Sequence, residues 1–273
     1  MSEIAIRPIE SFSELRAVED LQKDVWGTPD LDVVPLTHLV ATIAAGGVLL
    51  GAFDGATLVG FVYGFVGKEE GQITHHSHML AVKPAYRDLN LGYKLKLAQR
   101  EAVLAQGINV ITWTFDPLQS LNAYFNFKKL RVVAERYLVN FYGEEAPSFL
   151  HRSGTDRLWV KWLINSDRVV QRIDKSPVPP EVPIIKPMIE VAPDNTPIEL
   201  SHDYSSNQLS IEIPNDINTL QGQTPEVAVA WRETTRQAFR KAIDARYQVV
   251  EFYRIDRNEQ KIGVYLLSHI LSR

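Results

Sequence analysis

The stretch from residue 72 to residue 131 constrains the fold of this chain more than any other. Its residue pattern predicts a strand, a short polar loop, a long amphipathic helix, a second strand and a short helix. The first strand covers about Gln72 to Lys83 and ends at Pro84, which has no amide hydrogen to donate to a sheet. The helix covers about Leu91 to Ala105, and the β-branched and aromatic run 110–115 is typical of a buried strand.

The loop that joins this strand to the helix, residues 87–92, has the features of an anion site. The first N–H groups of a helix have no partner inside the helix, and they point outward with the positive end of the helix dipole. Asn90 tolerates a left-handed backbone, and Gly92 leaves room for a close approach to the main chain. We therefore expect this junction to bind an anion, most often a phosphate group.

Residues 80–92, LAVKPAYRDLNLG, resemble the acyl-CoA-binding motif of the GNAT superfamily of N-acyltransferases. In that family a strand ends near a proline, and the sequence Arg/Gln-x-x-Gly-x-Gly/Ala then opens a helix. Arg87, Asn90 and Gly92 occupy the three key places, with Asn90 where the family usually has Gly. The resemblance implies that the loop holds the pyrophosphate of CoA and that the strand end offers backbone groups to its pantetheine arm.

A second signature of the same family follows downstream. Residues 122–130, NAYFNFKKL, resemble its Asn/Ala-containing helix, which ends in Tyr-x-Lys-Leu-Gly-Phe. Phe127 stands where Tyr is usual, and Arg131 and Val132 replace Gly-Phe. The two motifs are one strand apart, and the resemblance covers roughly residues 4–165.

The resemblance implies a set of cofactor-binding residues on the strand end, the loop, the helix start and the second motif. They are Leu80, Ala81, Val82, Arg87, Asp88, Leu89, Asn90, Leu91, Gly92, Tyr93 and Asn122. The implied co-substrate is acetyl-CoA or another acyl-CoA.

The elements that precede the loop agree with this family. A short strand, two helices and a three-strand antiparallel meander are predicted before it, and two more strands after it. We therefore expect the fold class α/β (α+β), with a GNAT-like mixed, mostly antiparallel central sheet flanked by helices.

A dense group of prolines divides the chain beyond this part. Seven of the 15 prolines lie between Pro177 and Pro197, a density that disfavours regular helix or central strand. We predict a GNAT-like acyltransferase domain at residues 1–173, an extended connector at 174–200 and a small β-α-β-β unit at 201–273, packed on the first domain. Because this last unit has no glycine-bearing phosphate loop, we expect it to have a structural or substrate-covering role.

The composition of the chain disfavours or excludes several classes of function and of site. The net charge of −4 gives no electrostatic basis for binding nucleic acid or an anionic membrane. The chain has no Cys, which excludes disulfides, thiolate metal sites and a cysteine nucleophile. The first ten residues lack a basic region followed by an apolar core, so we expect no signal peptide and a cytoplasmic protein. The sequence leaves open whether the protein forms a homodimer.

Three histidines precede the loop. Strand alternation places His76 and His78 on one face and His75 on the other. Two imidazoles are too few for a zinc site, so we expect no metal. His76 falls where the histone-acetylating branch of the family keeps its general-base Glu, and an imidazole with a pKa near 6.5 suits that task. We predict His76 as the proton acceptor, with His78 as second candidate; a hydrogen-bonded strand residue is the alternative.

Phe127 raises the question of the proton donor. Most family members have a Tyr at this place, and it protonates the departing CoA thiolate. Tyr124 lies three residues earlier, so its hydroxyl can reach the same region, and we predict it as the replacement donor. Since the CoA thiol has a pKa of about 8.5, loss of the acid should slow turnover without abolishing it.

These observations together predict an N-acyltransferase. It would move an acyl group, acetyl first and succinyl second, from acyl-CoA to the primary amine of a small molecule such as an amino acid, by direct attack. A strand amide would stabilise the oxyanion, and orientation of the two reactants would be the main catalytic effect. The alternative is a non-catalytic acyl-CoA-binding or regulatory module with the same fold, in line with Asn90 and Phe127.

Overall fold

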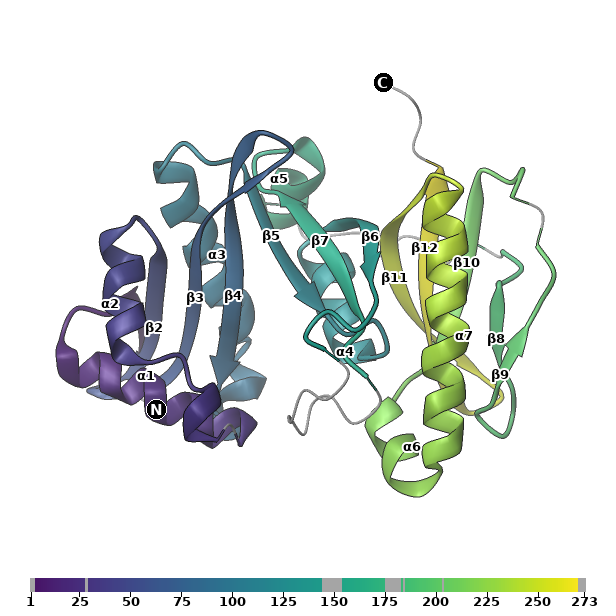
Figure 1. Cartoon of the computed structure of the whole chain (residues 1–273), viewed down its shortest axis with the longest axis horizontal. Coiled ribbons are helices and arrows are strands. Elements are labelled where there is room, and N and C mark those ends of the chain that lie inside the picture. Colours follow the sequence, from purple (N-terminus) through teal and green to yellow (C-terminus); the bar gives the residue numbers. More distant parts are fainter. Residues whose placement is uncertain are drawn as a thin grey trace. The chain divides into compact units, whose positions relative to one another are not determined.

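The computed structural model describes residues 3–27, 29–143, 154–174, 183, 185–202 and 204–269. These residues form two compact units, which divide between Trp113 and Thr114 (Figure 1). No helix in the described part of the chain has the length and apolar character needed to cross a membrane.

The first unit contains a mixed sheet in the order β1-β2-β3-β4-β5. Its first four strands are antiparallel to their neighbours, β2, β3 and β4 form a meander, and the fifth strand runs parallel to β4. Gly55 and Gly71 make the two tight turns of the meander with φ angles of 59° and 84°, which glycine adopts without strain. The strands are β1 (Ile4–Pro8), β2 (Val48–Asp54), β3 (Thr57–Glu69), β4 (Gln72–Val82) and β5 (Val110–Phe115).

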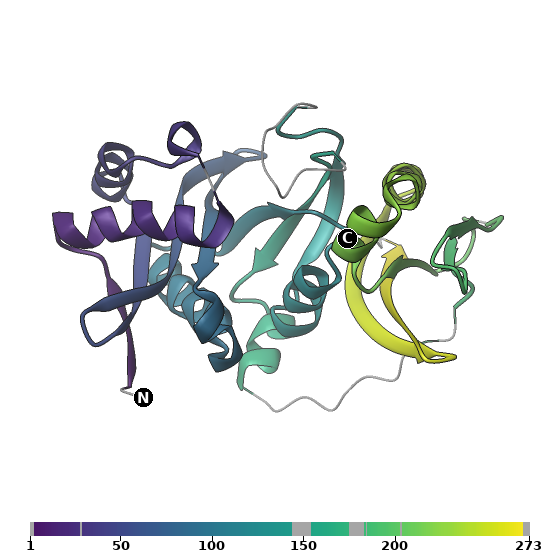
Figure 2. The same cartoon turned by 90° about the horizontal axis from the view of Figure 1, so that it is seen from below.

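Helices cover both faces of this sheet. Figure 2 shows α1 (Phe12–Trp26) and α2 (Leu36–Ala44) on one face and α3 (Leu91–Ala105) on the other. Short 3₁₀ segments, η1 (Asp30–Asp32) and η2 (Pro84–Leu89), precede α2 and α3. A capping box begins α1: the Glu14 N–H donates to Ser11 Oγ, and the Ser11 N–H donates to the Glu14 carboxylate. The α1 side chains Leu15, Val18 and Leu21 pack on β2 and β3.

β4 departs from regular pairing at two places. Opposite β3 the register shifts so that His78 is an extra residue, a β-bulge that turns the strand locally. Gly64 allows β3 to approach the bulge, because a Cβ atom there would lie 2.4 Å from Nε2 of His75. Toward β5, the described pairing consists of His75↔Ile111 and His76↔Thr112, and Figure 1 shows the two strands diverging beyond it. β4 and β5 therefore form a fork.

The second unit contains strands in the order β7-β6-β11-β12-β10, all antiparallel to their neighbours. Its long helix α7 (Pro225–Asp244) lies against β11 and β12 (Figure 2). The other elements are α4 (Ser120–Ala123), the π-helical turn η3 (Tyr124–Lys129), β6 (Val133–Leu138), β7 (Arg157–Leu163), α5 (Asp167–Asp174), the hairpin β8 (Ile189–Val191) and β9 (Pro197–Glu199), β10 (Gln208–Pro214), α6 (Ile217–Gln223), β11 (Tyr247–Arg257) and β12 (Gln260–His269).

Buried ion pairs hold α7 to the rest of the second unit. Both Arg232 guanidinium nitrogens donate to the Asp116 carboxylate, at 2.8 and 2.7 Å, and both residues are buried. Arg236 donates to Asp156, which is fully buried and also accepts from the Tyr137 hydroxyl at 2.8 Å. Burial opposes the charge of Arg232, but Asp116 raises its pKa above the ordinary value, so the guanidinium stays charged.

The expected fold class is confirmed: the chain is α/β, with a mixed and mainly antiparallel sheet flanked by helices. The helix expected at 91–105 has those bounds, and β10, α7, β11 and β12 supply the predicted C-terminal β-α-β-β elements. Part of the predicted connector at 174–200 lies outside the described residues, and the three-part division stays a prediction.

Three local features of the structure are not evident from the sequence pattern. β8 and β9 form a short hairpin inside the proline-rich segment, because Asn195 takes the left-handed φ of 65° that the turn needs. Ala98 and Ala102 of α3 are half-buried, whereas the polar Lys96 and Gln99 are buried with Leu91, Leu95 and Val103. Asp156 and Arg157 are buried, although charged residues are mostly exposed in folded proteins.

Candidate active site

The loop after β4 has the backbone expected of an anion site. Asn90 takes the left-handed conformation, with φ of 56° and ψ of 27°, and α3 begins at the next residue. A Cβ atom on Gly92 would come no closer than 3.7 Å to any other group, in this case Leu80. The packing of the protein therefore does not require a glycine at this position. The space next to the Gly92 main chain is open to a ligand.

The implied cofactor residues differ in how accessible they are. Arg87 and Asp88 are exposed, and Arg87 Nε donates to the Val82 carbonyl at 3.4 Å. The Tyr93 N–H donates to the Asn90 carbonyl at 3.1 Å, which engages one of the amides expected to hold phosphate. The N–H groups of Leu91 and Gly92 precede the first acceptor that the helix itself could supply. Leu80, Ala81 and Val82 pair with β3 on one edge and border the fork on the other.

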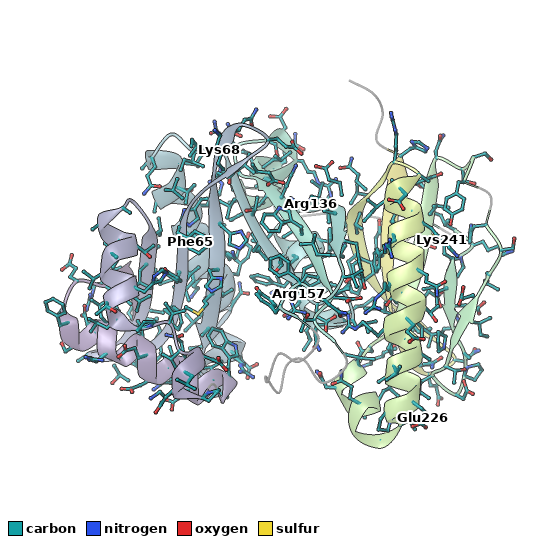
Figure 3. The ribbon with its side chains drawn as sticks, in the orientation of Figure 1. Phe65, Lys68, Arg136, Arg157, Glu226 and Lys241 are labelled. Carbon is teal, nitrogen blue, oxygen red and sulfur yellow. The ribbon has the colours of Figure 1, made fainter. Side chains whose placement is uncertain are left out.

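One face of β4 carries a histidine–aromatic cluster made of His38, Tyr63, Phe65, His76 and His78. The Phe65 ring lies 5.4 Å from His76 and 5.8 Å from His78, centroid to centroid, and the two imidazoles are 6.4 Å apart. Tyr63 lies 6.2 Å from His78 and 6.5 Å from His38. Figure 3 labels Phe65 on β3. The prediction that His76 and His78 share a face is confirmed.

His76 is held within this cluster. Its Nδ1 lies 3.1 Å from the Thr112 hydroxyl, across the last β4–β5 pair. Burial, with smaller effects from His78 and Lys96, lowers the pKa of His76 to about 4. The imidazole is therefore neutral at physiological pH, the form that accepts a proton.

The opposite face of β4 carries a buried polar network. Lys96 Nζ donates to Ser77 Oγ at 2.7 Å and to Gln99 Oε1 at 3.3 Å. The Ser77 hydroxyl donates to the same Gln99 oxygen, so the Gln99 amide nitrogen faces His75 Nε2 at 3.2 Å. His75 lies in this network, as the predicted alternation requires.

Two predicted site residues belong to the second unit. Asn122 is exposed, and Tyr124 is half-buried with the Arg254 guanidinium 4.9 Å from its ring centroid. Phe127 is fully buried against Phe115 and Tyr265, with ring centroids 6.1 and 5.8 Å away. A side chain so enclosed by rings explains why a phenylalanine is suitable there. No cluster of three or more metal-ligating side chains occurs among the described residues.

Several residues of this region could not be found by motif. His38, Tyr63, Phe65 and Thr112 reach His76 or its neighbours through strand register and helix packing, which one sequence does not fix. The sequence indicates the burial of Lys96 and Gln99 only weakly: they are polar residues about one helical turn apart, on the side of the helix that carries Leu95.

Comparison with known proteins gives fold-level similarity. No family model matches the chain, and no curated protein matches it. Among solved structures, the ribosomal-protein-S18-alanine N-acetyltransferase of Escherichia coli is 12% identical, covers 60% of this chain and 96% of its own, and has a TM-score of 0.48. An aminoglycoside 6′-N-acetyltransferase from Enterococcus faecium is 17% identical, with 59% and 98% covered and a TM-score of 0.46. A GNAT family acetyltransferase from Elizabethkingia anophelis with acetyl-CoA bound is 14% identical, with 59% and 97% covered and a TM-score of 0.46. The structural neighbours thus include acetyltransferases of the family that the two motifs resemble, at identities that leave the activity to be argued from this chain's own residues.

Proposed function

We propose that this protein is an acyl-CoA-dependent N-acyltransferase that acts on the primary amine of a small molecule such as an amino acid. The observation that carries the proposal is the conjunction in one unit of a left-handed Asn90 at a helix start and a neutral His76 on the preceding strand. The first feature fits a pyrophosphate group and the second fits proton transfer from an amine. Acetyl-CoA is the favoured donor and succinyl-CoA the second. A cytoplasmic location is part of the proposal.

The residues present fit an acyl-CoA. The main chain at Leu91 and Gly92 would hold the pyrophosphate, with Arg87 as a charged partner, and the fork edge of Leu80 and Val82 would hold the pantetheine arm. Asp88 is the one exposed carboxylate in this loop, and its charge opposes phosphate binding. When bound, the thioester would supply an activated acyl group, and the chain itself need form no covalent bond.

His76 would accept the proton that the amine loses. With a pKa of about 4 it is a weak base toward a free ammonium group, so the amine must arrive neutral. The nitrogen becomes far more acidic as it bonds to carbon, and a neutral imidazole held by Thr112 can then take its proton. The Phe65 ring covers one side of the imidazole, and this burial favours the neutral form.

Replacement of Gly92 tests the cofactor loop. Gly92→Val is expected to lower CoA affinity at least tenfold, because the added atoms occupy the space over the helix start. The open surroundings of Gly92 predict little loss of folding stability. Calorimetric titration with CoA measures the affinity. Gly107→Ala is the control for a general effect on the helix, since Gly107 follows the C-terminal end of α3 and has a left-handed backbone. An unchanged affinity in Gly92→Val would show that the pyrophosphate does not bind here.

Replacement of Tyr124 tests the proposed donor. Tyr124→Phe removes one hydroxyl and keeps the ring on which Arg254 lies. Turnover is expected to fall by about tenfold while CoA affinity stays the same. CoA thiolate, whose conjugate thiol has a pKa of about 8.5, is a good leaving group even without protonation by an acid. Steady-state rates with acyl-CoA in excess measure the effect. Wild-type turnover in this variant would remove Tyr124 from the mechanism.

The alternative function, a non-catalytic acyl-CoA-binding module, differs from the proposed enzyme in that it would not turn over acyl-CoA. Turnover of acetyl-CoA or succinyl-CoA with any primary amine excludes it. Thermal stabilisation by CoA without turnover across an amine panel would favour it, since ligand binding to the native state alone raises the melting temperature.

A further inference from the structure

Lys96 of α3 is a buried cation at the fork between β4 and β5. The two strands pair at His76↔Thr112, and Ser77 and Trp113 are the next residues on each strand. Lys96 Nζ is 2.7 Å from Ser77 Oγ and 3.8 Å from the centroid of the Trp113 ring. The ammonium group therefore contacts both strands at the point where they part.

No described carboxylate forms an ion pair with this charge. Lys96 is 3% exposed, and its described partners are the Ser77 hydroxyl, the Gln99 amide oxygen and the indole face of Trp113, all of them neutral. His75 adds no charge, because burial lowers its pKa to about 4 and Gln99 donates to its Nε2. Burial also lowers the pKa of Lys96 to about 7, so its charge is sensitive to any anion nearby.

The buried ammonium group of Lys96 is unfavourable for the stability of the protein. Burying an ammonium group without an acidic partner costs free energy, and a methionine of similar length would fill the space without that cost. Groups perturbed by burial concentrate where a protein acts on charge. The fork of β4 is also the part of the first unit that the proposed function assigns to the pantetheine arm.

The direction of the bound arm brings its sulfur to Lys96. The loop at 87–92 follows the end of β4, so an arm that extends from it along the fork edge runs from Val82 back toward Ser77. Five strand residues span roughly 16 Å. On the proposed function, on which this inference rests, we propose that the buried Lys96 ammonium stabilises the negative charge that the CoA sulfur gains when the acyl group leaves.

The step balances in atoms and charge. The amine nitrogen forms a bond to the acyl carbon, the carbon–sulfur bond breaks, and its electron pair stays on sulfur. The proton of the amine goes to His76, and the thiolate later takes a proton from water. A cation fixed in a water-poor fork stabilises the negative charge that develops on sulfur as the carbon–sulfur bond breaks, and the thiolate in turn favours the charged form of Lys96.

The thiol of bound CoA reports this effect without turnover. Thiolate absorbance in the ultraviolet, followed against pH at saturating CoA, gives the pKa of the bound thiol. In the wild type it should lie about one unit or more below the free value of about 8.5, and in Lys96→Met it should return to that value or higher, so that the ratio of thiolate to thiol at a given pH changes by about tenfold or more. Ser77→Ala is the matched control, since it removes one hydrogen bond and keeps the ammonium; its shift should be small.

The kinetic outcome should agree. Lys96→Met is expected to lower kcat by at least tenfold with little change in KM for acyl-CoA. If that variant does not fold, Lys96→Gln gives the same comparison, because it retains a donor to Ser77. Equal thiol titrations in wild type and variant, with CoA bound and turned over, would overturn this inference alone. Failure of the wild type to bind CoA would overturn the proposed function and this inference together.

Discussion

Asp116→Ala is expected to destabilise the second unit by about 3–5 kcal/mol, the cost of leaving one partner of a buried ion pair unpaired. Asp116 is buried and accepts two hydrogen bonds from Arg232, which is 3% exposed. Without the carboxylate, the guanidinium keeps its charge in a place that water does not reach. Thermal unfolding should shift downward by roughly 6–20 °C.

A double replacement separates the pair from the packing around it. Asp116→Leu combined with Arg232→Met removes both charges, and the loss should be smaller than for Asp116→Ala. Asp194→Ala, at an exposed carboxylate in the turn between β8 and β9, is the control and should change stability by less than about 1 kcal/mol. A melting temperature of Asp116→Ala within about 2 °C of wild type would contradict the structural role assigned to this pair.

His76→Ala is expected to lower turnover by about 10²-fold or more, the usual effect of losing a positioned general base. The His76 Nδ1 atom lies 3.1 Å from the Thr112 hydroxyl, and its ring lies 5.4 Å from that of Phe65, which together fix the orientation of the imidazole. His78→Ala is the matched control: His78 is exposed on the bulge, and its loss should cost less.

The pH dependence gives a second measure of the same assignment. Burial lowers the pKa of His76 to about 4, so, when the neutral form of the amine is kept saturating at each pH, wild-type turnover should hold on lowering the pH toward 5 and fall as His76 is protonated near 4. His76→Ala should lack this acidic limb. Equal rates for both histidine variants and the wild type between pH 5 and 9 would remove His76 from the mechanism.

The same titration affects folding. A histidine whose pKa falls from 6.5 to about 4 on folding binds its proton more weakly in the native state. His75 and His76 therefore contribute stability that is complete above pH 6.5 and is lost as the pH falls toward 4. Acid unfolding experiments must separate this loss from the kinetic limb.

The local sequence predicted what depends on local physics. The bounds of α3 followed from helical periodicity, and the left-handed backbone of Asn90 followed from the tolerance of asparagine for that conformation. Each of these needs information from a few neighbouring residues.

The remaining features depend on contacts between distant segments. The bulge at His78 arises from the register between β3 and β4, and the environment of His76 requires Phe65 and Thr112 from two other strands. The burial of Phe127 depends on Tyr265, more than a hundred residues away along the chain. The burial of Lys96 follows from its contact with Trp113 at the fork of β4 and β5, which helical periodicity alone does not give.

Release of CoA thiol from acetyl-CoA, measured together with the mass of the acylated amine, tests the central claim most directly. The assay uses the full chain, a panel of amino acids and other small primary amines at pH 7.5, and succinyl-CoA as a second donor. The account predicts that at least one amine gives equal amounts of thiol and amide product, at a rate that falls about 10²-fold in His76→Ala. CoA binding with no amide product from any amine would contradict the proposed activity.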